Sequence, residues 1–219
     1  DLEQSYEHPL DMRGLKFIYY GMLLGLAAFL FTGTINLIIS FGKFIVMIYG
    51  LYHLCKTDLC YRAPWNWCWA CMTFSLIDLG ITLWFIFTQH MYPWWLLVIM
   101  SIGGTVLYVL YIRALCKSTA FISRQTGQNA QVEPIIWSRW RWLWISQTVY
   151  IIAYIVYAIG IRFSLFNIAM IVQLMSVVTL FVMTWVIAMF NACFLVLNNQ
   201  YRIYPEYGTP SLTDGKKRK

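Results

Sequence analysis

The chain has 219 residues, of which 60% are hydrophobic and 11% are charged. Soluble domains have about 45–50% apolar and about 25% charged residues, so this composition excludes a water-soluble globular domain, and it also excludes a disordered chain, which needs low hydrophobicity and high charge. The formal net charge of +7 would suit nucleic-acid binding, but the basic residues lie mostly between apolar runs and no nucleic-acid-binding motif is present, so we expect no nucleic-acid partner.

The remaining class is an all-α integral membrane protein. A helical span needs about 20 apolar residues. Apolar runs separated by charges, Gly or Pro predict a compact bundle of about six transmembrane helices, over residues 17–31, 37–54, 67–88, 94–115, 142–161 and 165–197. Residues 1–16 are then an N-terminal segment, residues 17–198 the transmembrane domain, and residues 199–219 a basic tail.

The first two runs are short and are joined only by residues 32–36. They form either two separate helices or one long tilted helix with a break. In the first run, Gly21 and Gly25 lie four residues apart and Ala28 follows them. This face of small residues predicts close helix packing, within the protein or with a partner, although the pattern is frequent by chance in apolar runs.

Asp78 is the most informative residue, because it lies near the middle of the third predicted span. A carboxylate at that depth costs about 2.5–3.5 kcal/mol on insertion scales, and such groups normally face the bundle interior and have a partner. Lys43, within the second span, is the candidate partner, since the two spans run in opposite directions and place both residues in the outer-to-middle part of the membrane. The two residues either fix helix packing or form a site for a proton, an ion or a ligand.

The fourth span is followed by a polar stretch that ends in Glu133-Pro134, which predicts a cytoplasmic loop over residues 117–136. Tryptophans and arginines then alternate over residues 137–144. Trp prefers the headgroup level of a bilayer and Arg can reach the headgroups, so we expect an aromatic belt here and an interfacial start to the fifth span.

The sixth run is about 33 residues long and contains no Gly or Pro, so it predicts one helix that either tilts strongly or protrudes from the membrane. Gln173, Ser176 and Thr184 recur within it at roughly helical spacing. They either line a polar face toward Asp78, as part of a ligand or ion site, or hold helices together by hydrogen bonds. Other polar residues within the spans, such as Gln147, are open to the same two interpretations.

Lysine and arginine positions predict the orientation. With six spans, all the basic residues except Arg162 and Lys43 fall on one side of the membrane. By the positive-inside rule both termini are cytoplasmic, which predicts a plasma or inner membrane protein.

All six cysteines map to the cytoplasmic half of this topology, so we expect a reducing environment and no disulfides. Four of them, together with a neighbouring histidine, resemble a zinc pattern in composition: Cys55, Cys60, Cys68, Cys71 and His53. Their spacing is loose for a zinc site, so these are weak candidates, and we expect no metal and no cofactor. Free thiols that pack as small apolar groups, or reversible lipidation at the membrane edge, are the other interpretations.

No catalytic set is visible. No histidine lies at the centre of a span, and metalloprotease and phosphate-binding motifs are absent. The favoured function is therefore a transporter-, channel- or substrate-binding-type membrane subunit with an intramembrane Lys/Asp site and an unknown substrate.

The alternative function is a non-catalytic accessory or scaffold subunit of a larger membrane complex, and a lipid-directed membrane enzyme has less support. The expected partners are membrane lipid and either further copies of the chain or other membrane subunits. A water-accessible cavity at Asp78 would favour the first function, and a dry, fully paired Asp78 would favour the accessory subunit.

Overall fold

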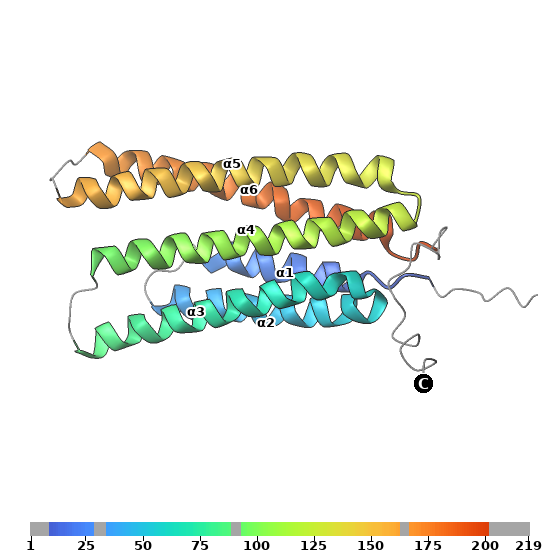
Figure 1. Cartoon of the computed structure of the whole chain (residues 1–219), viewed down its shortest axis with the longest axis horizontal. Helices are drawn as coiled ribbons and strands as arrows, with labels where there is room; N and C mark the ends of the chain where they lie inside the picture. The colour runs from blue at the N-terminus through green and yellow to red at the C-terminus, as the bar shows by residue number, and fades with distance from the viewer. Residues whose placement is uncertain (1–8, 29–33, 89–92, 163–166, 202–219) are drawn as a thin grey trace, which may run out of the picture.

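The computed structural model describes residues 9–28, 34–88, 93–162 and 167–201, and within these ranges the fold is all-helical, with no strand. The six apolar runs each form one α-helix, and a single 3-10 turn precedes the third (Figure 1). In chain order the elements are α1 (Arg13–Ala28), α2 (Thr34–Thr57), η1 (Leu59–Tyr61), α3 (Arg62–Thr88), α4 (Trp94–Gln125), α5 (Asn129–Arg162) and α6 (Asn167–Leu197). In the described residues, four helices, α2, α3, α4 and α6, are long and apolar enough to cross a membrane.

The first two runs form separate helices that pack against each other in antiparallel directions. A Cβ atom at Gly50, in the second half of α2, would lie 2.6 Å from the carbonyl oxygen of Gly14, near the start of α1. Gly21 and Gly25, further along α1, lie against the first half and middle of α2, and Ala28 is buried at the end of α1. Small residues thus bring the two backbones into direct contact.

The six helices form a closed ring. Each helix packs against the next one in the chain, and α1 also packs against α6. Figure 1 shows successive helices running in alternate directions. A closed ring of this kind has an interior to which every helix can contribute side chains.

The described ends of the chain meet at one end of the ring. The backbone N–H of Leu10 donates to the carbonyl of Gln200 at 3.0 Å, and the N–H of Asn199 donates to the carbonyl of Leu10 at 3.0 Å. The N–H of Met12 donates to Oδ1 of Asn198 at 3.2 Å. We call these contacts the clasp, and we call the end of the bundle where they lie the termini end. The starts of α1, α3 and α5 and the ends of α2, α4 and α6 lie there.

The polar stretch at residues 117–136, which the sequence predicts as a loop, is helical apart from a three-residue turn around Gly127. Gly127 has a φ of 71°, which suits glycine. The hydroxyls of this stretch are satisfied within the helix: Thr119 donates to the carbonyl four residues earlier at 2.9 Å, and Ser123 to the carbonyl three residues earlier at 2.7 Å. Polar residues of this kind can therefore lie within a helix and need not form a loop. The basic tail beyond residue 201 lies outside the described residues.

The side chains that are fully buried concentrate in the half of the bundle nearest the termini end. They come from all six helices and from η1, and they include Leu15, Leu51, Tyr61, Tyr111, Leu115, Leu143, Val186 and Phe190. The turn η1 is held to α4, because the Ser118 hydroxyl donates to the carbonyl of Cys60 at 2.8 Å. This packed apolar core, which we call the plug, fills the ring at the termini end.

Candidate functional site

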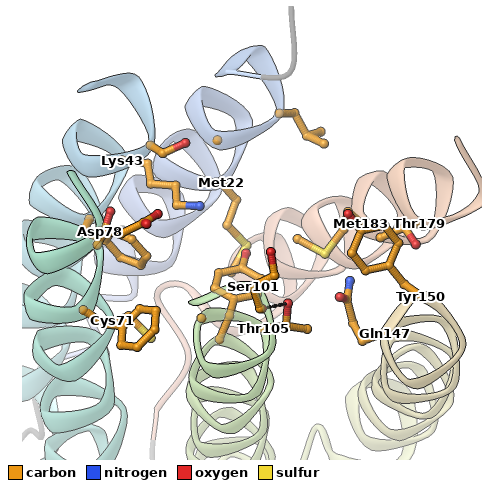
Figure 2. Close-up of a pocket in the computed structure, with 18 of the residues that line it drawn as sticks. Met22, Lys43, Cys71, Asp78, Ser101, Thr105, Gln147, Tyr150, Thr179 and Met183 are labelled. Carbon is orange, nitrogen blue, oxygen red and sulfur yellow. Dashed lines mark hydrogen bonds between the residues drawn. The ribbon is translucent and has the colours of Figure 1, made fainter. Parts of the chain in front are cut away.

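A cavity of about 340 Å³ lies inside the ring, next to the plug, and it is partly open to the outside. Every helix contributes to its wall. One residue from each, in helix order, is Met22, Lys43, Asp78, Thr105, Gln147 and Thr179 (Figure 2). The cavity is therefore a product of ring closure, since no pair of helices could form it alone.

The cavity wall gathers polar groups from the middle of apolar helices. Hydroxyl, amide and charged groups line it, from Ser40, Lys43, Ser75, Asp78, Ser101, Thr105, Tyr108, Gln147, Tyr150, Ser176 and Thr179. Polar groups are costly in hydrocarbon, and they face a bundle interior or a water-filled space when they occur there. Their convergence from five helices, α2 to α6, on one space distinguishes this cavity from an apolar packing defect.

Lys43 projects from α2 toward the cavity. Its Nζ lies 4.9 Å from the ring centroid of Phe44 and 5.3 Å from that of Tyr108, which is close enough for a cation–π interaction with each ring. Its stem occupies the space beside Gly25, where a Cβ would lie 2.9 Å from Lys43 Cδ. The glycine of α1 and the aromatic rings of α2 and α4 therefore position the ammonium group on the wall.

Asp78 lies on the same wall, on the neighbouring helix α3, and its side chain is half-buried. Figure 2 shows Lys43 and Asp78 entering the cavity from adjacent helices. The structure thus brings the two charged residues that the sequence singled out to one cavity. A direct ion pair between them stays a prediction.

The residues predicted on the sixth span have different positions. Ser176 lines the cavity. Thr184 is exposed outside the cavity wall, and its hydroxyl donates to the Leu180 carbonyl of its own helix at 2.9 Å. The side chain of Gln173 lies outside the described residues.

Several wall residues did not stand out in the sequence. Nothing in the sequence distinguishes Ser101 and Thr105 of α4 or Tyr150 of α5, and Gln147 is one of several polar residues within the spans. Within α4, the Thr105 hydroxyl donates to the carbonyl of Ser101 at 2.8 Å (Figure 2). A Ser or Thr that can bond to its own helix gives no signal of the direction it faces, whereas a full charge does.

The weak zinc candidates do not form a ligand set. Among the described residues, no three His, Cys, Asp or Glu side chains converge on a point. His53 is surrounded by aromatic rings, the nearest being Tyr49 with a centroid distance of 4.7 Å. Cys68 and Cys71 are buried, whereas Cys55 and Cys60 are partly exposed, and all four are free thiols.

No family model matches the chain, and no curated protein or solved structure is detectably similar to it. The function therefore has to be argued from the cavity itself.

Proposed function

We propose that this chain is a transporter-, channel- or substrate-binding-type membrane subunit whose central cavity binds a small polar solute. The observation that carries the proposal is that the cavity is partly open and that Lys43 and Asp78 both lie on its wall. Two charges that served helix packing alone would be expected in a dry, filled interface. A space of this size beside them, lined with hydroxyls, favours a ligand.

The proposed topology has six membrane-spanning helices with both termini in the cytoplasm. The basic residues of the described helices, apart from Lys43 and Arg162, lie toward the termini end: Arg13, Lys16, Lys56, Arg62, Arg113, Lys117, Arg124, Arg139 and Arg141. The positive-inside rule assigns that end to the cytoplasm. The plug then closes the cytoplasmic half, and a solute enters the cavity from the opposite side.

The charges of the wall define the class of solute. The Lys43 ammonium can bind an anionic group, and the Asp78 carboxylate can bind a cationic group or accept a proton. A solute that carries both charges would satisfy both residues without leaving a lone charge in the membrane. The volume of about 340 Å³ is near the lower limit of ligand pockets, which indicates a small molecule. We therefore favour a small zwitterionic or amphoteric solute.

The first experiment tests whether the cavity is open to water, independently of any ligand. A cysteine is introduced by Ser176→Cys in the cavity wall, and by Val186→Cys in the plug as the matched control on the same helix. A membrane-impermeant maleimide is then applied to the external face of cells or oriented vesicles, and the wild-type chain gives the background from its native cysteines. We expect labelling of the Ser176→Cys variant alone. Equal, background-level labelling of both variants would favour the accessory subunit instead.

The second experiment tests binding. The purified chain is mixed with small zwitterions, such as free amino acids and betaines, and the thermal midpoint is measured, since a ligand stabilises the folded state that binds it. A stabilising solute should lose its effect in Lys43→Met and keep it in Lys56→Met, which removes a lysine of the same helix outside the cavity. A solute that stabilises the wild type and Lys43→Met equally would contradict the assigned role of Lys43.

A further inference from the structure

A second hollow, of about 560 Å³, lies on the outer side of the ring toward the termini end. It runs between η1 and the start of α3 on one side and the second half of α4 on the other. Its wall on α4 is a stripe from Leu110 to Phe121, and its wall on α3 includes Trp67. Eleven helical steps of 1.5 Å make the stripe about 16 Å long. We call this hollow the lateral groove, and it shares no wall residue with the central cavity.

The lateral groove is positively charged. Arg113 and Lys117 lie one helical turn apart on its α4 wall, and both are exposed. No acidic residue lines the groove, and the ion pairs found in the described part of the chain involve neither of these cations. The Arg113 guanidinium lies 5.5 Å from the ring centroid of Trp140 on α5, which restrains it in place. Arg113, restrained by this contact, and Lys117, one helical turn away, are therefore both available for an external anion.

The rest of the groove is largely apolar, and the hydroxyl of its Ser118 is already bonded to the carbonyl of Cys60. Leu110 lies about one turn before Arg113 on α4, nearer the middle of the bundle, and Ala114 lies between the two cations in sequence. Trp67, on the α3 wall, is 36% exposed. Tryptophan favours the headgroup level of a bilayer, so with Trp67 at that level we expect the two cations near the lipid phosphates and Leu110 nearer the acyl chains. The groove thus presents charge and apolar surface in the order in which a phospholipid presents phosphate and hydrocarbon.

We infer that the lateral groove binds an anionic glycerophospholipid of the leaflet at the termini end. The phosphate lies between Arg113 and Lys117, and an acyl chain lies along Trp67 and Leu110. Charge complementarity carries this assignment, since basic pockets between helices on the cytoplasmic side attract anionic headgroups. The inference needs a chain that spans a membrane with its termini end in the cytoplasm, and it does not depend on solute binding in the central cavity.

Native mass spectrometry of the full chain in detergent tests the inference. The probes are phosphatidylglycerol and phosphatidylcholine with identical acyl chains, and glycerol 3-phosphate as a headgroup without acyl chains. We expect phosphatidylglycerol to bind more tightly than phosphatidylcholine, and glycerol 3-phosphate to compete poorly. The double variant Arg113→Gln/Lys117→Gln should bind phosphatidylglycerol roughly 30-fold more weakly, from the loss of both cations.

Two further variants separate the site from general effects. Ala114→Phe fills the groove while it keeps both charges, and it should also lose the bound phosphatidylglycerol. Lys56→Gln/Arg141→Gln removes two positive charges from outside the groove and should bind phosphatidylglycerol as the wild type does. Equal binding of the two lipids to the wild type, an equal loss in both double variants, or full binding by Ala114→Phe would each overturn the inference. Competition by glycerol 3-phosphate at the same concentration as the lipid would assign the groove to a free phosphate ester instead.

Discussion

The contact between α1 and α2 can be tested with two alanine substitutions in one helix. Gly50 and Gly42 both lie in the interior of α2, so replacing either by alanine gains up to about 1 kcal/mol of helix propensity. Their surroundings differ. A Cβ at Gly50 would lie 2.6 Å from the Gly14 carbonyl oxygen and 2.9 Å from the Cβ of Phe17, whereas a Cβ at Gly42 would meet no atom of another described helix within 4 Å.

The clash decides the sign of the effect at Gly50. Overpacking costs about 1–3 kcal/mol, and the upper part of that range applies because a backbone oxygen and a Cβ cannot rotate away. Gly50→Ala should therefore lower the free energy of unfolding by about 2 kcal/mol, after the gain in propensity is subtracted. Gly42→Ala should leave it unchanged or raise it by up to about 1 kcal/mol.

Reversible unfolding in mixed micelles with a rising fraction of dodecyl sulfate, followed by tryptophan fluorescence, gives both free energies. The comparison cancels the propensity gain, since the two positions share one helix. A Gly50→Ala variant as stable as Gly42→Ala would refute the close approach of α1 and α2 at this point. A large loss of unfolding free energy in both variants would show that helix propensity and the space around the new Cβ do not determine the stability of this helix.

Three further outcomes are expected. Ser118→Ala should lower stability by about 1 kcal/mol, because it removes the bond to η1, whereas Ser146→Ala, whose hydroxyl bonds to its own helix, should have little effect on the thermal midpoint. Asp78→Asn should be less stable than Asp78→Asn combined with Lys43→Met, because the single variant leaves a lone ammonium in the membrane; an equal loss of thermal midpoint would contradict the pairing. Trypsin should cleave at Lys216–Lys219 only from the cytoplasmic face, and cleavage of sealed cells from outside would reverse the topology.

The number and order of the helices could be predicted from the sequence because a run of apolar residues in lipid has one favourable backbone conformation, the α-helix. A helix satisfies every backbone hydrogen bond within itself, so each apolar run becomes a helix. The polar stretch near Thr119 is predicted as a loop because the same residue types form loops in water. In the structure the hydroxyl of Thr119 bonds to a carbonyl of its own helix instead. The sequence also predicts a boundary at Pro134, yet this residue lies within α5, in the second turn.

The cavity could be predicted only where it is charged. A charged side chain within a membrane is costly unless it faces the bundle interior. The free-energy cost of Lys43 and Asp78 therefore predicts that both side chains point inward. Gln147 and Ser101 carry no such cost, because an amide or hydroxyl can face a neighbouring helix or its own backbone. The outer surface of a membrane helix is as apolar as its packed surface, so periodicity does not reveal which face points inward. Only the closed ring places these side chains on one wall.

The clasp sets an order for assembly. It joins Leu10 and Met12 to residues 198–200, so the seam between α1 and α6 cannot form until α6 has been synthesised. In the proposed membrane topology, an incomplete ring leaves the wall that carries Lys43 and Asp78 open toward lipid until then. The close pairing of Gly14 and Gly50 gives the first two helices a stable contact during this interval. Arrival of the last helix is then the step that shields both charges from the bilayer, and the same step completes the cavity.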